Sequence, residues 1–66
     1  MYPEYNPGDS FLYYGDSIDK HGNLGVVERI EEWSGVNAYV CKVKGIIWTL
    51  TLDARKMKPV APDWVM

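Results

Sequence analysis

Side chains that could perform catalysis or hold a metal ion are few in this sequence, and they stand apart from one another. The only histidine is His21, and the only cysteine is Cys41. A general base needs a reacting partner within hydrogen-bond reach, and zinc needs a cluster of Cys, His or carboxylate ligands. Ser10, Ser17 and Ser34 lie in turn segments and belong to no G-x-S-x-G motif. We therefore expect a protein that is not an enzyme and that has no metal site and no cofactor.

The polar segment "GDSIDKHGNLG" (residues 15–25) carries the remaining candidates for ligand binding. Asp16, Asp19 and Asn23 offer oxygen atoms, but their spacing does not match the D-x-[DN]-x-[DN]-G calcium loop. Gly22 and Gly25 precede an expected strand rather than a helix, which excludes the phosphate-binding glycine motifs. We interpret this segment as a solvated loop.

The charge is unevenly distributed along the chain. Residues 1–37 carry seven acidic and two basic residues, a net charge of −5, whereas residues 38–66 carry five basic and two acidic residues, a net charge of +3. The whole chain has a net charge of −2. Such a balance disfavours non-specific nucleic-acid binding, which depends on neutralising phosphates. It leaves one candidate nucleic-acid surface, formed by Lys20, Lys42, Lys44, Arg55, Lys56 and Lys58.

A chain of 66 residues is long enough for one small domain, which we place over residues 1–66 with its core in residues 7–60. A single cysteine allows no intrachain disulfide, so the fold depends on apolar burial. Nine aromatic residues supply large buried areas. No apolar run approaches the roughly 20 residues that a membrane helix needs, and no signal peptide is recognisable. We expect a cytoplasmic protein with no membrane partner.

The clearest structural signal is the segment "YVCKVKGIIWTLTL" (residues 39–52). Lys44 and Gly45 can form a two-residue hairpin turn, because glycine tolerates positive φ. This turn pairs residues 43 with 46, 41 with 48 and 39 with 50. Side chains alternate along a strand, so these six apolar residues share the core face. They are Tyr39, Cys41, Val43, Ile46, Trp48 and Leu50. The other face, which includes Val40 and Ile47, is expected to face outward.

The preceding segment, Val26–Trp33, could be a short helix or a strand. A helix would have barely two turns between Gly25 and Gly35, which is marginal. In the strand, a four-residue loop over Ser34–Asn37 pairs Trp33 with residue 38. A β-bulge at residues 28–29 then brings Val27 and residue 30 to the core side. We therefore predict a bulged strand with Trp33 on the outer face.

The remaining segments complete a small all-β domain. "DSFLYY" reads as a first strand with Phe11 and Tyr13 inward and residues 12 and 14 outward. After Leu52, "DARKMK" suits one 3₁₀ turn, because Pro59 restricts any longer helix. "MKPV" is then a last short strand with residues 57 and 60 inward. Five short strands predict a small antiparallel barrel. Residues 61–66 are expected to form a tail, with Trp64, Tyr2 and Tyr5 in the two terminal segments.

Several large side chains are predicted on the outer surface. Exposed apolar groups mark partner surfaces when they are contiguous, and Trp and Tyr are common in binding hot spots. The acids at positions 28, 31 and 32 surround Trp33, which suits a basic or proline-rich partner. The candidate partner-binding residues are Tyr14, Glu31, Trp33, Val40 and Ile47. The alternative is that the terminal tails cover this surface.

One motif resembles a known family. The pattern G-x-x-G-x-V-x-x-I, filled by Gly22, Gly25, Val27 and Ile30, resembles the KOW motif of SH3-like barrels in ribosomal proteins and transcription elongation factors. "PGDSFLY" and "TLTLDARKMKPV" resemble the first and last parts of such barrels. The resemblance implies an SH3-like barrel with a 3₁₀ turn before its last strand, and an RNA- or ribosome-associated role. KOW loops usually carry Lys or Arg around the glycines, where this chain has Asn23, Leu24 and Val26.

Three hypotheses follow. The first is a small protein-interaction module, which resembles accessory proteins of bacteria and their phages. The second is a KOW-like nucleic-acid-binding module that uses the basic residues named above. The third is a homo-oligomer closed through an outer face or an open strand edge.

Overall fold

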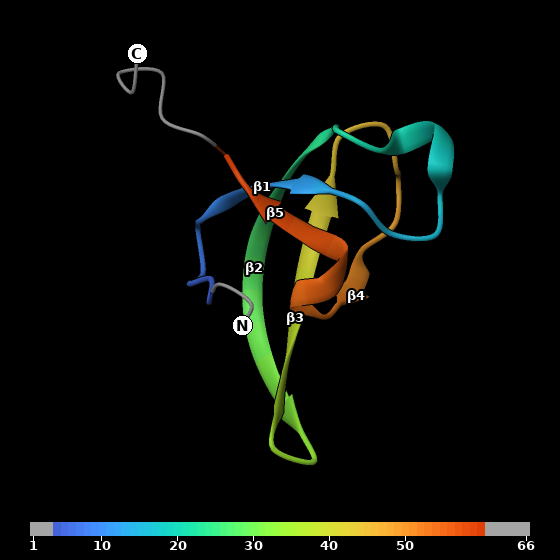
Figure 1. Ribbon diagram of the computed structural model, residues 1–66. Helices are drawn as coiled ribbons and strands as arrows, with labels where there is room; N and C mark the ends of the chain where they lie inside the picture. The colour runs from blue at the N-terminus through green and yellow to red at the C-terminus, as the bar shows by residue number, and fades with distance from the viewer. Residues whose placement is uncertain (1–3, 61–66) are drawn as a thin grey trace.

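The computed structural model describes residues 4–60, and this part of the chain contains five strands and two single turns of 3₁₀ helix (Figure 1). We expected strands with one 3₁₀ turn before the last of them, and both features are confirmed. The terminal aromatic residues Tyr2 and Trp64 lie outside the described residues. In chain order the elements are β1 (Ser10–Tyr13), η1 (Ile18–Lys20), β2 (Leu24–Trp33), β3 (Val36–Val43), β4 (Leu50–Leu52), η2 (Ala54–Lys56) and β5 (Met57–Pro59).

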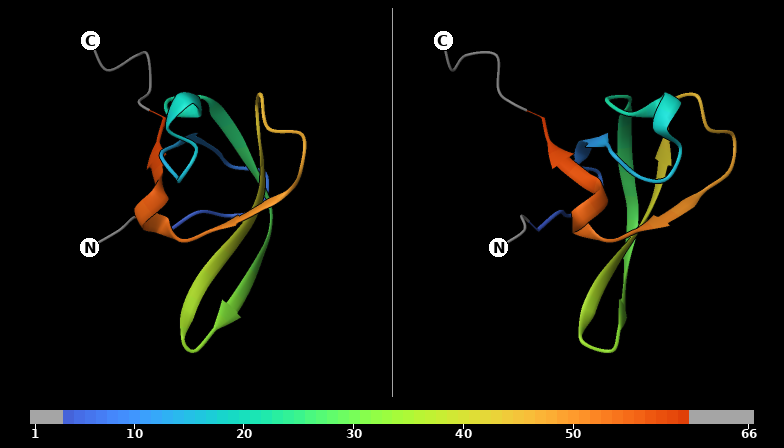
Figure 2. Two further views of the ribbon diagram at one scale, coloured as in Figure 1. Left: turned by 90° about the vertical axis from the view of Figure 1, so that its right-hand side faces the viewer. Right: turned by 45° about the vertical axis from the view of Figure 1, so that its right-hand side comes forward.

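The strands form one antiparallel sheet in the order β4-β3-β2-β1-β5. Each of the first three strands pairs with the next in sequence, and β5 returns to pair with β1. β4 and β5 stand at the two ends of this order, so the sheet is not closed. The β2–β3 hairpin is the longest pair, and its tip projects beyond the other strands (Figure 2).

Strand β2 carries the predicted bulge. Val27 pairs with Cys41 and Arg29 pairs with Val40, so Glu28 is the extra residue that the partner strand does not match. The bulge reverses the alternation that would otherwise place Glu28 in the core. Val27 is buried as a result, and Ile30 packs against the core from a partly buried position. The strand assignment for residues 26–33 is confirmed.

The turn between β2 and β3 is shorter than we predicted. Trp33 pairs with Val36, not with Ala38, and only Ser34 and Gly35 connect the strands. Both turn residues have positive φ, 53° at Ser34 and 79° at Gly35. This backbone is that of the two-residue hairpin turns whose twist matches the flanking strands. The register is therefore two residues away from the predicted one.

The pairing of β3 with β4 also differs from the prediction by two residues. The Ile46 N–H donates to the Val43 carbonyl at 3.0 Å, so the expected turn is present. The chain then leaves β3 and returns only at Leu50, which pairs with Cys41, while Leu52 pairs with Tyr39. Residues 44–49 form a loop. Trp48 was predicted in the core, but its side chain is 63% exposed.

The core lies on one side of the sheet and is rich in aromatic rings. Phe11, Tyr13 and Met57 are buried there as predicted, together with Tyr39 and Cys41. Val60 was predicted inward but is exposed. The buried cluster is completed by Tyr5, Val27, Val43 and Leu52.

Tyr5 is a core residue that sequence analysis placed in a terminal segment. Its ring meets Tyr39 edge-on, with the centroids 5.4 Å apart, and meets Phe11 at 6.1 Å. The Tyr5 N–H donates to the Tyr39 hydroxyl at 3.3 Å. Edge-to-face ring pairs add to the stability that area burial provides. The segment before β1 is therefore part of the packed structure.

The outer side of β3 is also covered. Ala38 and Val40 project away from the core side, yet they are buried, and Val40 is only 3% exposed. Val40 pairs with Arg29 on one side and with Thr51 on the other, so side chains of both neighbouring strands flank it. Val40 points outward as predicted, but the prediction that it is exposed is wrong.

Candidate functional site

An apolar surface lies at the tip of the β2–β3 hairpin. Trp33 and Val36 face each other across the strand pair, and their side chains are 59% and 60% exposed. The two-residue turn places both at the tip of the hairpin, beyond the last β3–β4 pair among residues 4–60. We call Trp33, Val36 and the residues lining the two hollows beside them the hairpin-end surface.

Two hollows flank the start of β3. The larger, about 490 Å³, has the core-facing residue Tyr39 in its lining, and the smaller, about 230 Å³, has the outward-facing residues Trp33 and Ala38. Val36, Asn37 and Asp53 line both of them. The larger hollow is also lined by Glu4, Tyr39 and Arg55, and the smaller by Trp33, Ala38, Thr51 and Leu52. Asp53 is the charged residue that both hollows share, and the larger hollow also has Glu4 and Arg55 in its lining.

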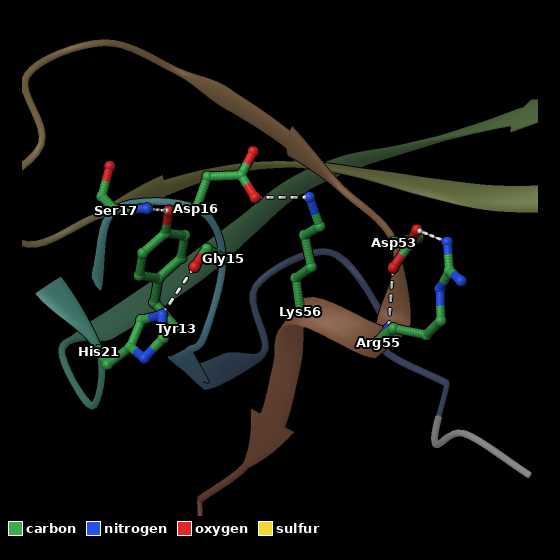
Figure 3. Close-up of polar contacts among 8 residues, drawn as sticks. All are labelled: Tyr13, Gly15, Asp16, Ser17, His21, Asp53, Arg55 and Lys56. Atoms are coloured by element: carbon green, nitrogen blue, oxygen red, sulfur yellow. Dashed lines mark hydrogen bonds and ion pairs between the residues drawn. The ribbon is translucent and has the colours of Figure 1, made fainter.

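Asp53 is fixed at the junction of the two hollows. One of its carboxylate oxygens accepts the Arg55 backbone N–H at 2.9 Å, which caps η2. The other accepts from the Arg55 guanidinium at 3.1 Å (Figure 3). The side-chain hydrogen bond from Arg55 is the main reason that the pKa of Asp53 lies below its ordinary value. The carboxylate therefore stays charged at neutral pH.

The predicted partner-binding residues do not form one surface. Glu31 lies on the outer face near Trp33, and the Arg29 guanidinium pairs with it at 3.2 Å. Tyr14 lies just after β1, where the Lys58 ammonium sits 4.6 Å from the centre of its ring. Ile47 is 93% exposed in the loop after β3, at the opposite end of the hairpin from Trp33. Of the predicted set, the structure therefore brings Glu31 and Trp33 together.

A second apolar surface was missed by the sequence analysis. Ile18, Ile47 and Trp48 are all exposed, and a hollow of about 330 Å³ lies between η1 and the 44–49 loop. We call these three residues the loop-end surface. The signal in the sequence is the run Ile46–Ile47–Trp48, because three consecutive bulky apolar residues cannot all face one side of a strand.

Most of the predicted nucleic-acid-binding residues are already paired. Four of the six form ion pairs: Lys20 with Asp19, Lys42 with Glu28, Arg55 with Asp53 and Lys56 with Asp16, at N···O distances of 3.7, 3.6, 3.1 and 3.0 Å. The Lys56 and Arg55 pairs are drawn in Figure 3. Lys58 lies over the Tyr14 ring. Alternating acids and bases dilute the positive potential that attracts phosphates.

His21 and Cys41 have structural surroundings. The His21 Nε2 donates to the Gly15 carbonyl at 2.6 Å, and its ring lies 5.2 Å from that of Tyr14. Cys41 has no exposed surface. Burial, with a smaller contribution from the Glu28 charge, raises the pKa of the Cys41 thiol to about 11. A thiol in this state is protonated at neutral pH and is a poor nucleophile.

Two further findings concern residues 4–60 only. No group of three His, Cys, Asp or Glu side chains there is arranged to hold a metal ion. No helix in that range is long and apolar enough to cross a membrane.

Comparison with known proteins does not place the chain in a family. No family model matches it, and no curated protein and no solved structure is detectably similar to it. The functional argument therefore depends on the geometry of this molecule.

Proposed function

We propose that this chain is a non-enzymatic protein-interaction module built on an SH3-like barrel, and that the hairpin-end surface binds its partner. The observation that carries the proposal is the Trp33–Val36 pair, in which two large apolar side chains stand opposite each other and are more than half exposed. Tryptophan in such a position is typical of binding hot spots, because one side chain can bury a large area.

The strand order supports the barrel. An arrangement in which β5 pairs with β1, after a 3₁₀ turn, is the order expected of SH3-like barrels. The KOW-like residues have geometric roles that fit the same fold. Gly22 has a φ of +85°, Gly25 makes room for the Phe11 ring, and Val27 is buried. These roles support the resemblance in shape and do not bear on RNA binding.

Nucleic-acid binding is the less favoured alternative. The net charge is −2, and four of the six candidate basic side chains pair with acids of the same chain. Phosphate binding would have to break or share these pairs. It would also weaken by orders of magnitude between low and moderate salt, whereas an apolar partner surface would respond little.

The test is partner capture from source-cell lysate on the tagged chain, with and without nuclease. The structure offers a matched pair of variants for it. Trp33→Ala removes the hairpin-end tryptophan, and Trp48→Ala removes an equally exposed tryptophan at the opposite end. We expect to capture a protein whose binding survives nuclease and salt. The Trp33→Ala variant should no longer capture it, and the Trp48→Ala variant should still do so.

Each other result has a defined meaning. If Trp48→Ala alone abolished capture, the partner site would be assigned to the loop-end surface. If nuclease abolished capture, the KOW-like alternative would be favoured. Self-association in the absence of lysate would favour a homo-oligomer. Because Trp33 is exposed, Trp33→Ala should change the free energy of unfolding by no more than about 1 kcal/mol, so lost binding would not reflect unfolding.

A further inference from the structure

The start of β3 has a strand partner on one side only. Within residues 4–60, the pairing of β3 with β4 ends at Tyr39 and Leu52, while its pairing with β2 continues to Val36. After Leu52 the chain turns at Asp53 into η2. Residues 36–38 therefore border a strand position, in line with β4, that residues 4–60 do not fill. We call this position the open lane.

The backbone of Asn37 points into this lane. Trp33 and Val36 flank a two-residue turn, so they exchange hydrogen bonds with each other. Hydrogen-bonded and non-hydrogen-bonded pairs alternate along an antiparallel ladder. The next pair, Glu32 and Asn37, is of the second kind, so the N–H and C=O of Asn37 face away from β2. An antiparallel strand placed opposite Asn37 would accept one hydrogen bond and donate another.

The two hollows lie where the side chains of such a strand would point. Successive side chains of a strand project to opposite faces. A residue that points to the core side would enter the larger hollow, beside Glu4 and Asp53, and its neighbour would enter the smaller hollow, beside Trp33 and Leu52. The open lane and the hollows together have the form of a β-strand addition site.

The charges define the partner. Glu4 and Asp53 line the larger hollow with Arg55, and Glu32 lies opposite Asn37 on the same side of the ladder. Three carboxylates and one guanidinium give this side a net charge of −2. The smaller hollow is lined mainly by apolar side chains. A strand with Lys or Arg alternating with apolar residues matches both sides.

We propose that the hairpin-end surface binds an extended peptide segment, basic and apolar in alternation, which adds to the sheet at Asn37. This inference rests on the proposed function, because it specifies the partner of the same surface. The hydrogen bonds to Asn37 fix the position of the segment, and the side chains in the two hollows select it.

The probe is a six-residue peptide of alternating lysine and valine with capped ends, titrated into the ¹⁵N-labelled chain and followed by NMR. We expect saturable shifts at Val36, Asn37 and Ala38. A peptide with glutamate in place of lysine should bind at least about tenfold more weakly, because it meets the same carboxylates. A peptide of three lysines followed by three valines should also bind more weakly, because only alternation fills both hollows.

The backbone contacts have their own test. Asn37→Pro removes the N–H that faces the lane and leaves the β2–β3 ladder intact, because edge strands tolerate proline where the N–H faces outward. It should weaken binding of the alternating peptide at least about fivefold, as expected for one lost hydrogen bond. Asn37→Ala keeps the N–H and is the matched control, with little change expected. If Asn37→Pro does not fold, peptides N-methylated at one residue at a time give the same information, with sensitive and insensitive positions alternating.

Failure of the inference is distinguishable from failure of the proposed function. Absence of saturable shifts up to millimolar peptide, or binding insensitive to both Asn37→Pro and N-methylation, would overturn strand addition. If a captured protein still depended on Trp33 but not on the Asn37 N–H, the interaction module would stand without strand addition. If capture depended on neither residue, strand addition at Asn37 and the assignment of the partner site to the hairpin-end surface would both be wrong.

Discussion

The Phe11 ring lies directly over the backbone of Gly25, its antiparallel partner on β2. A methyl group added at Gly25 would overlap several atoms of the ring. Phe11 has no exposed surface and therefore has little room to move. Gly25 thus makes room for the Phe11 ring.

This contact predicts the effect of Gly25→Ala. The variant should lose about 1–3 kcal/mol of unfolding free energy, measured by urea denaturation, because added volume strains a packed core. In a Phe11→Leu background the added methyl should be better tolerated, which a double-mutant cycle would show. Equal losses in both backgrounds would mean that the ring is not the obstacle.

The hairpin turn predicts a stabilising substitution. Ser34 has a φ of 53°, a conformation that asparagine adopts more readily than serine. Ser34→Asn creates the Asn-Gly pair favoured in two-residue turns and should add about 0.5 kcal/mol, or roughly 2–4 °C in Tm. Gly35, with a φ of 79°, is the control. Gly35→Ala should destabilise by about 1 kcal/mol, and a neutral result there would argue against this turn.

The buried Tyr5 predicts opposite effects for two substitutions. Its hydroxyl is buried and has no hydrogen-bond partner within residues 4–60. Tyr5→Phe removes that unsatisfied group and keeps the ring, so stability should be unchanged or rise by up to about 1 kcal/mol. Tyr5→Ala empties the site between Tyr39 and Phe11 and should cost about 3 kcal/mol. Similar behaviour of the two variants in thermal unfolding would contradict a core role for this residue.

Cys41 predicts a loss of stability at high pH. Its pKa is raised to about 11 from the ordinary value of 9.0, chiefly by burial. Between these values the unfolded thiol ionises while the folded one stays protonated. The contribution of the protonated Cys41 thiol to the free energy of unfolding is therefore complete below pH 9. It declines as the pH rises toward 11. Between pH 8 and pH 10.5 the expected loss is roughly 1–2 kcal/mol.

Comparison with Cys41→Ala isolates the Cys41 contribution, because the two proteins differ only in this side chain. The wild-type chain should lose more stability than the variant over this pH interval in urea denaturation. Parallel pH profiles would show that the thiol ionises equally in the folded and unfolded states.

The sequence predicted most of the strand content, the bulge at Glu28 and the 3₁₀ turn before β5. These features depend on local rules. Alternation of side chains identifies the core-facing residues of β1 and β3, and Pro59 limits the helix before it. The same rules placed Trp33 on the outer surface, where the structure has it.

The candidate site was predicted only in part. Trp33 and Glu31 are near each other, but Ile47 and Tyr14 lie elsewhere and Val40 is buried. The hollows beside Asn37 could not be predicted, because they form between segments that are far apart in sequence. The larger lies between β3, η2 and the segment before β1, and the smaller between the end of the β2–β3 hairpin and β4. The exposure of Val40 could not be predicted either, because it depends on side chains of the neighbouring strands that cover it.

The sequence by itself determined which side chains of each strand share a face, because alternation is a property of the strand alone. Only the tertiary structure decided which residues pair. Both hairpin registers differ from the predicted ones by two residues, and a shift of two leaves every side chain on its face. The positive φ values of Ser34 and Gly35 select one register of the first hairpin. In the second, the chain returns at Leu50, so Leu50 and Leu52, rather than Trp48, pack against the core.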